Sequence, residues 1–412
     1  MNKIKLTILL ALTAIIGAYA DNGINSPYSR YGVGILANQS LGINRQMGGL
    51  GYGLRSHKYI NIVNPASFSE ADTLTMLFEA GASLQNANFK EGDKRINAKN
   101  ASLEYIAMQF RIRKNLGMSI GFLPYSRVGY SFSKVSNEGS YESSTDSYNG
   151  SGGIYQPYVG IAWRPLKSLS IGLTGSYIYG DITHDVAISF ANSTSLRRIY
   201  NASINSYKID LGVQYIMQLA EKQSVTFGAV YSFGHNMNAD ATITEINSSS
   251  SKEKTVDSGF SIPHTFGAGF VYNYKNKWKF GADYTFQDWK SSTFFGNGEG
   301  LGRSKVSIGA EYSPTRLSNN ILKMIEYRAG AYYSQPYAKI NDRTGCNEYG
   351  VSAGISLPFY NNNNRYSHAT LHISGEFARM KPESPSMITE NYLRINVGIT
   401  FNESWFMKMK VR

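Results

Sequence analysis

LRINVGITF, residues 393–401, alternates apolar residues with polar or small ones along its whole length. Side chains of a β-strand point alternately to opposite faces, so this period of two predicts a strand with one apolar face. The apolar face carries Leu393, Ile395, Val397, Ile399 and Phe401. A strand of a soluble sandwich can show the same pattern. The fold class therefore depends on how often the pattern recurs.

The same alternation recurs along most of the chain and predicts fourteen strands. They are expected at residues 73–86, 101–113, 115–133, 153–164, 168–182, 204–218, 223–236, 262–275, 277–290, 304–314, 324–337, 347–359, 367–380 and 391–402. Too few helical segments separate them to cover so many apolar faces. An apolar outer face and a polar inner face are typical of a barrel in lipid.

The connections between these segments alternate between short and long. Short turns are expected near 113–115, 165–167, 219–222, 275–277 and 360–366, and 315–323 is a longer member of this set. Long links are expected at 87–100, 134–152, 183–203, 237–261, 291–303, 338–346 and 381–390. Bacterial barrels have short periplasmic turns, long outer loops and an even strand number. The sequence thus predicts an all-β, 14-stranded antiparallel transmembrane β-barrel over 73–402.

Composition agrees with this fold. The chain has 30 Tyr, 20 Phe, 4 Trp and 40 Gly, and only 17% of its 412 residues are charged. After the N-terminus, no stretch approaches the roughly 20 apolar residues that a membrane helix needs. The formal net charge is +12. In an exported chain we expect basic turns to face the headgroups of outer-membrane lipid, and we expect no nucleic acid partner.

The N-terminus MNKIKLTILLALTAIIGAYA, residues 1–20, predicts a secretory signal peptide. It has a basic start, an apolar core and a small-x-small cleavage site that ends at Ala20. The alternative is a membrane anchor, for which the apolar run is short. The mature chain would begin at Asp21, and residues 403–412 would form a periplasmic tail. The expected location is the outer membrane of a Gram-negative bacterium.

Residues 21–72 precede the first predicted strand and show no clear period. One interpretation is a flexible periplasmic tail. The other is a hatch, or plug, that folds into the lumen. The apolar and aromatic content is high for a disordered tail, and a barrel this wide conducts water unless something fills it.

Several local patterns resemble those of the FadL-type family of outer-membrane channels, the long-chain fatty-acid transporters, in a form associated with Bacteroidota. The resemblance is carried by the hatch residues Arg45, Gly48, Gly49, Asn64, Pro65 and Ala66 and by two hairpins, 152–182 and 262–291. It covers nearly the whole mature chain. It implies passive uptake of a hydrophobic, fatty-acid-like small molecule, with the six hatch residues forming a gate.

The stretch FLPYSRVGYSF, residues 122–132, lies in the third predicted strand but contains a proline. Pro124 cannot donate to a sheet ladder, and Gly129 permits a bulge. The resembled family has a kinked third strand with a lateral opening. This implies a side exit at Pro124, Tyr125, Arg127 and Gly129. The alternative is that Pro124 ends a strand near the membrane interface.

Charged and polar residues recur on the inward faces of the predicted strands. The predicted lumen lining comprises Asp283, Glu311, Glu326, Arg328, His372, Glu376 and Arg394. Unpaired buried charges are costly, so we expect the acidic members to pair with the hatch arginines, Arg30, Arg45 and Arg55.

One strand face raises the alternative of a catalytic role. His372, Ser374 and Glu376 share one strand face, but alternation separates successive members by about 6.5–7 Å, too far for direct hydrogen bonds. The glycine-rich stretches lack a nucleotide-binding context. The only cysteine is Cys346. We therefore expect no enzyme activity, no cofactor and no metal.

Two functional hypotheses remain open at the level of sequence. The first is a channel for hydrophobic small molecules with lateral release. The second is a non-transporting barrel subunit of an outer-membrane secretion, assembly or surface machine. In that case the long loops 134–152 and 237–261 would dock outer-membrane protein partners.

Overall fold

The computed structural model describes residues 23–73, 75–136, 143–190, 195–256, 259–295, 297–298, 300–314, 321–340, 343–361, 364–384 and 387–404. The predicted signal peptide and residues 405–412 of the predicted tail lie outside this part of the chain. Residues 403–404 belong to the last strand.

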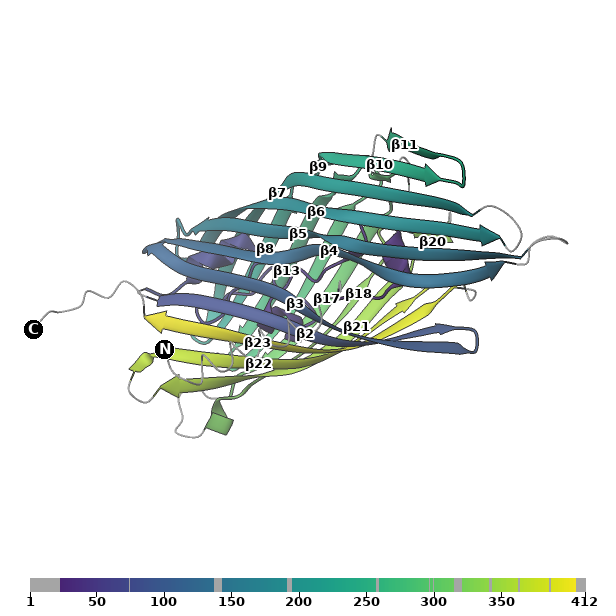
Figure 1. The fold of residues 1–412 in the computed structure, drawn as a ribbon. Coiled ribbons are helices and arrows are strands. Elements are labelled where there is room, and N and C mark those ends of the chain that lie inside the picture. The colour runs from purple at the N-terminus through teal and green to yellow at the C-terminus, as the bar shows by residue number, and fades with distance from the viewer. Residues whose placement is uncertain are drawn as a thin grey trace, which may run out of the picture.

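Fourteen antiparallel strands of the described chain close into one barrel (Figure 1). They are β2 (Thr75–Glu91), β3 (Lys94–Arg113), β4 (Leu116–Ser136), β5 (Ser144–Trp163), β6 (Leu169–Phe190), β7 (Leu196–Ala220), β8 (Gln223–Ser232), β13 (His264–Tyr274), β14 (Trp278–Asp288), β17 (Gly302–Tyr312), β18 (Glu326–Ser334), β21 (Asn347–Asn361), β22 (Asn364–Lys381) and β23 (Thr389–Ser404). The last strand pairs with the first from Thr75↔Ser404 to Lys90↔Thr389, which closes the barrel. The predicted fold class is confirmed.

The strand faces carry the predicted polarity. On β6, Ile171, Leu173 and Tyr177 are exposed on the outer face, whereas Ser170 and Ser176 are buried on the inner face. This apolar exterior is the reverse of a soluble protein and suits a hydrocarbon environment. The helices of the described chain are short, and none is long and apolar enough to cross a membrane.

One end of the barrel carries the connections after β4 and β6, and we call it the long-loop end. The opposite, short-turn end carries the turns at 114–115, 164–168, 221–222 and 275–277. At the long-loop end the strands run further than predicted. Segments 87–100 and 183–203, predicted as loops, are almost entirely strand. Segment 134–152 is also strand in the parts that are described.

The predicted loop 237–261 likewise contains two strands, β10 (Ala239–Ile246) and β11 (Ser251–Val256). They extend the sheet beyond β7 (Figure 1). Short two-residue strands pair nearby. They are β9 (His235–Asn236) with β12 (Ser261–Ile262), β15 (Thr293–Phe294) with β16 (Asn297–Gly298), and β19 (Lys339–Ile340) with β20 (Arg343–Thr344).

Parts of these extensions cover an apolar core with their inner faces. The long-loop cluster consists of Val33, Tyr125, Val128, Tyr130, Ile154, Ile178, Ile182, Ala202, Ile204, Met237, Ala241, Phe260, Ile262, Trp289 and Phe294. Its members come from the N-terminal segment, from β4 to β7, from β10 and the residue Met237 before it, and from β12, β15 and the connections around them. Burial of these side chains stabilises strand beyond the length that a bilayer requires.

The N-terminal segment, residues 23–73, packs inside the barrel. It contains η1 (Pro27–Arg30), β1 (Ile35–Leu36), α2 (Gly42–Gln46) and η2 (Pro65–Glu70), and a further short helix, η3 (Ile321–Met324), follows β17. Met47 is fully buried and lies against the inner surface at Gly309 and Gly330. Side chains at those two positions would overlap the Met47 backbone, so glycine permits this close approach.

Candidate functional site

The wall of the barrel is interrupted between β3 and β4. Their ladder runs from the short-turn end only as far as Ile106↔Phe122. Beyond that point β3 continues beside β2, and β4 continues beside β5, without a β3–β4 pair (Figure 1). We call this break in the β3–β4 ladder the opening, and it lies in the half of the wall nearer the long-loop end.

The cause of this interruption lies in FLPYSRVGYSF. Pro124 has no N–H with which to continue a ladder. The pairing of β4 with β5 shifts between Pro124 and Ser126, so Tyr125 is bulged. A bulge bends its strand and re-aims a side chain. The Tyr125 ring is buried in the long-loop cluster, inside the barrel.

The N-terminal segment covers the free edge of β4 from within. Strand β1 pairs antiparallel with residues 126–127 of β4. The Ala37 N–H donates to the Tyr125 carbonyl at 2.9 Å, and the Gln39 side chain donates to the Pro124 carbonyl at 2.9 Å. These bonds satisfy backbone groups that would otherwise face the opening.

The first described residues fill the space between the two separated strands. The Gly129 N–H donates to the Ser29 hydroxyl at 3.1 Å. A Cβ on Gly129 would lie 2.3 Å from the Ile24 carbonyl oxygen, and a Cβ on Gly23 would lie 2.9 Å from the Ser102 Cβ. Residues 23–29 thus contact β3 on one side and β4 on the other.

One buried carboxylate links both sides of the opening to the N-terminal segment. Glu104 on β3 pairs with Arg127 on β4 at 3.1 Å and with Arg45 on α2 at 2.9 Å. The hydroxyls of Ser83 and Ser102 also donate to this carboxylate. A buried charge is tolerated when it is paired and its remaining lone pairs are bonded, as they are here.

The predicted gate residues of α2 and the turn after it contact the barrel wall. The Gly48 N–H donates to the Ser352 hydroxyl at 3.0 Å, and the backbone there has φ of +67°. Gly49 has φ of +85°, and its N–H donates to the Asn44 carbonyl. Two successive left-handed residues form the sharp turn after α2, and glycine adopts this conformation without strain.

The Asn64-Pro65-Ala66 motif begins η2. The Asn64 side chain accepts the Ala66 N–H at 3.0 Å and donates to the carbonyls of Tyr52 and Val213. It therefore caps the helix and attaches it to β7. Pro65 occupies the first helical position, where its missing N–H costs nothing.

The predicted lumen residues all lie on inner faces and are largely buried, and they form three groups. Asp283 accepts the backbone N–H groups of Gly51 and Tyr52, at 2.6 and 2.9 Å. Arg328 pairs with both Glu311 and Glu326. Tyr59 of the N-terminal segment donates to Glu326 at 2.8 Å, which ties this group to the segment.

The third group lies on β22 and β23. Glu376 pairs with Arg394 at 2.8 Å. His372 Nδ1 lies 2.8 Å from the Ser356 hydroxyl, and its Nε2 lies 2.7 Å from the Thr400 hydroxyl. Its serine contact is therefore on β21 rather than with Ser374 on its own strand face. Among the described residues, no cluster of His, Cys, Asp and Glu is arranged to hold a metal.

The predicted pairing of hatch arginines with lumen acids is only partly as expected. Arg45 pairs with a barrel carboxylate, but the partner is Glu104, which is not among the predicted lumen residues. Arg55 pairs with Glu70 inside the N-terminal segment. Arg30 lies over the Tyr148 ring at 4.4 Å. The selected acids Glu311, Glu326 and Glu376 pair instead with barrel cations, and Lys58 of the segment lies 3.5 Å from Glu326.

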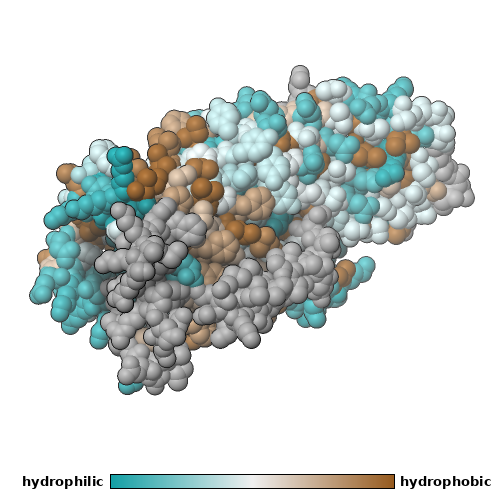
Figure 2. Space-filling model, turned by 60° about the vertical axis from the view of Figure 1, so that its left-hand side comes forward, coloured by the Kyte–Doolittle hydropathy of each residue, from teal (hydrophilic) through white to brown (hydrophobic). Residues whose placement is uncertain are grey.

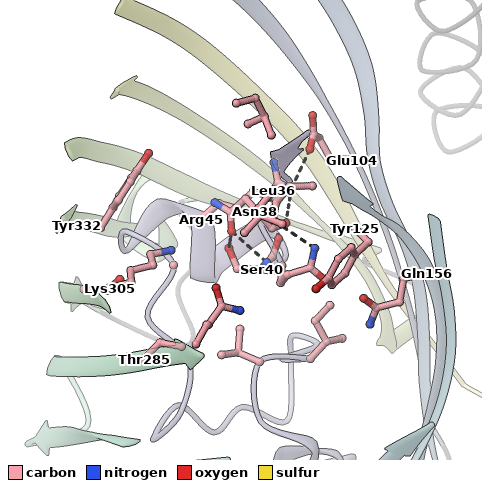
Figure 3. Close-up of a pocket in the computed structure, with 18 of the residues that line it drawn as sticks. Leu36, Asn38, Ser40, Arg45, Glu104, Tyr125, Gln156, Thr285, Lys305 and Tyr332 are labelled. Atoms are coloured by element: carbon pink, nitrogen blue, oxygen red, sulfur yellow. Dashed lines mark hydrogen bonds and ion pairs between the residues drawn. The ribbon is translucent and has the colours of Figure 1, made fainter. Parts of the chain in front are cut away.

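An internal cavity of about 250 Å³ adjoins the opening (Figure 3). Ile35, Leu36, Glu104 and Arg127 line the cavity and also border the separated strands. Tyr125 and Gln156 project from one side of it, and Lys305 and Tyr332 from the other.

Arg303 and Lys305 are two cations that line this cavity. Arg303 donates to the Ser334 hydroxyl and to the Gln287 side chain, both at 2.9 Å. The Lys305 ammonium lies 5.0 Å from the centroid of the Tyr332 ring. Within the described chain, neither has a carboxylate at ion-pair distance. Neither cation was among the predicted lumen residues. The signal was present, because Arg303 and Lys305 lie on the strand face opposite to the exposed Val306 and Ile308.

A family model described as BamG matches residues 1–412, the whole chain. The chain belongs to the BamG family. No curated protein matches the sequence.

Solved structures share the fold of this BamG-family chain at low sequence identity. The CymD monoaromatic hydrocarbon channel has a TM-score of 0.57 at 15% identity, covering 89% of this chain and 98% of that one. The P. putida toluene transporter TodX has a TM-score of 0.57 at 16% identity, covering 89% and 99%. A Pseudomonas aeruginosa FadL homologue has a TM-score of 0.51 at 10% identity, covering 89% and 98%. The predicted FadL-like architecture is thereby confirmed as a fold.

Proposed function

We propose that this protein is an outer-membrane channel for small hydrophobic molecules that carry an anionic group, as a fatty acid does. The molecule enters the internal cavity and leaves sideways between β3 and β4. The observation that carries the proposal is that the cavity and the opening share lining residues, Glu104 and Arg127 among them.

The chemistry of the cavity supports an amphiphile. Arg303 and Lys305 have no described carboxylate at ion-pair distance, and their positive charge would attract the head group. Ile24, Ile35 and Leu36 supply apolar surface toward the opening. A side exit would keep the apolar chain out of water, at about 0.8 kcal/mol per CH₂. No energy source would be required.

In this proposal the N-terminal segment is a plug. Buried contacts hold it at Glu104, at Asp283 and at Glu326, which belong to different strands around the wall. Opening of the path would require residues 23–39 to leave the β4 edge while the deeper contacts remain. Deletion of residues 23–71 should raise conductance to polar solutes in planar bilayers. An unchanged conductance would reject the plug.

Binding of dodecanoate to the full-length protein in lipid nanodiscs tests the head-group site. Wild type should bind dodecanoate and reject dodecyltrimethylammonium, which has the same chain and the opposite charge. Lys305→Gln combined with Arg303→Gln should weaken dodecanoate binding by about tenfold, because hydrogen bonds to a charged group contribute about 1.5–3 kcal/mol. Lys208→Gln is the matched control, because Asp210 already neutralises that cation in the same cavity. Equal binding of the two amphiphiles would reject the proposed ligand class.

A second function, a non-transporting subunit of an outer-membrane machine, is favoured by one observation. The long-loop cluster adjoins the cavity, since Tyr125 belongs to the cluster and also lines the cavity, and an apolar core there would obstruct a path from that end. Native mass spectrometry after gentle extraction separates the two functions. A lone chain with a lipid-like adduct supports the channel, and a chain with stoichiometric protein partners and no adduct supports the subunit.

A further inference from the structure

The short-turn end carries a set of exposed cations that the proposed channel function does not use. The basic turn belt consists of Arg113, Lys114, Lys167, Lys222, Lys275 and Lys277. They occupy four successive turns, between β3 and β4, β5 and β6, β7 and β8, and β13 and β14. All six are exposed, and none has a carboxylate at ion-pair distance within the described chain. The lysine Lys275 instead lies over the Tyr274 ring.

The opposite end of the barrel differs in its charge pairing. At the long-loop end, Arg197 pairs with Asp185 at 2.6 Å and Arg198 pairs with Glu245 at 2.5 Å. The edge strand β11 also mixes the two signs, because Glu253 separates Lys252 and Lys254. Paired and mixed charges suit contact with water. The turns of the belt hold one exposed carboxylate, Glu221 beside Lys222, against the six exposed cations, so their field is positive.

Each of these turns also exposes an apolar side chain next to its cations. Ile112 precedes Arg113, Leu166 precedes Lys167, Leu219 lies near Lys222, and Trp278 follows Lys277. In each of these turns a large exposed apolar side chain lies within three residues of a cation. Figure 2 shows hydrophilic and hydrophobic residues side by side on the face that it presents. Such a boundary between apolar surface and charge is typical of the level of lipid headgroups.

We propose that the basic turn belt binds the phosphate groups of anionic phospholipids in the leaflet that surrounds the short-turn end. The cations are spread over four neighbouring hairpins rather than gathered at one patch, so they match a surrounding layer of lipid better than one protein partner. The long side chains of Lys and Arg extend toward phosphates while their stems cover apolar surface. Cations near an anionic leaflet gain electrostatic attraction in this way.

Lipid retention by the full-length protein tests the inference. The protein is mixed with phosphatidylglycerol or phosphatidylethanolamine in mild detergent, and native mass spectrometry counts the lipids retained. Wild type should retain the anionic lipid preferentially. The variant Arg113→Gln, Lys114→Gln, Lys167→Gln, Lys222→Gln should lose that preference, with affinity falling about fivefold for each cation removed.

The matched control removes four exposed lysines from the long-loop end, by Lys94→Gln, Lys252→Gln, Lys254→Gln and Lys290→Gln. It has the same net charge change and should retain the preference for phosphatidylglycerol. Heat-modifiable electrophoretic mobility verifies that both variants are folded barrels. Equal loss in both variants, or no loss in either, would overturn the site. The site would also be overturned if the belt variant kept its lipids but lost an acidic protein that copurifies with wild type.

Discussion

Arg127 of β4 and Glu104 of β3 form an ion pair of 3.1 Å across the part of the wall where their strands do not pair. The Arg127 guanidinium also donates to the Leu103 carbonyl on β3. A side chain therefore joins the two strands where the backbone ladder ends. Because Glu104 also pairs with Arg45, the opening and the N-terminal segment are mechanically linked.

Glu104→Gln should loosen the opening and destabilise the protein. The substitution leaves two buried guanidinium groups facing a neutral amide, and breaking a buried pair costs about 3–5 kcal/mol. Thermal unfolding should occur at lower temperature, and amides of residues 23–39 should exchange faster with deuterium. Glu253→Gln on the exposed β11 is the control and should behave as wild type. Unchanged exchange in Glu104→Gln would show that the carboxylate does not hold the segment.

Gly172→Ala should displace η2 from the wall. A Cβ on Gly172 would lie 2.3 Å from the backbone carbon of Pro65, and overpacking of this kind costs about 1–3 kcal/mol. Gly175→Ala on the same strand is a matched control, since a Cβ there meets nothing within 4 Å. Unfolding temperatures should therefore fall for the first variant and stay within error for the second. Equal unfolding temperatures would contradict the packing of η2 against β6.

Asp283→Asn should release the turn that follows α2. The carboxylate accepts two backbone N–H groups, from Gly51 and Tyr52, and hydrogen bonds to a charged group contribute about 1.5–3 kcal/mol. Deuterium exchange at residues 51–54 should accelerate by more than tenfold. Asp240→Asn, at an exposed position on β10, provides the comparison and should leave this region protected.

The stability contributed by Glu70 should depend on pH. Burial opposes ionisation of Glu70, but the nearby Arg55 and Arg164 outweigh it and hold its pKa below the ordinary value of 4.5. A carboxyl whose pKa is lower when folded stabilises the fold above its unfolded pKa and loses this effect as the pH falls through the folded pKa. Unfolding of wild type and Glu70→Gln should therefore differ most above pH 4.5 and converge in stronger acid. A constant difference across this range would refute the assignment.

The fold was predictable because strand alternation is a local property. Segments such as 277–290 show it in sequence and lie close to the observed β14, Trp278–Asp288. The extensions at the long-loop end were not predictable in this way. Where these extensions bury apolar side chains, as at Ala202 and Ala241, the side chains belong to the same cluster as Val33 and Trp289, which are distant in the chain.

The site was predictable only in part for a related reason. Pro124 and Gly129 are unusual in a strand, so the sequence identified the position of the irregularity. Glu104 was not predicted because its ion pairs form where the β3–β4 ladder has ended. The end of the ladder depends on the bulge at Tyr125 in the next strand, and the sequence around Glu104 contains no sign of it.

Uptake of radiolabelled dodecanoate by intact cells tests the side path most directly. Gly23→Cys with Ser102→Cys, in a Cys346→Ser background, would tie the N-terminal segment to β3 inside the opening, where the two positions are in contact. Ser131→Cys with Asn149→Cys crosslinks a paired stretch of wall and serves as the control. We expect oxidation to stop uptake in the first pair only and reduction to restore it. Uptake that continues with the opening tied shut, or that is absent in both reduced proteins, would contradict lateral transport.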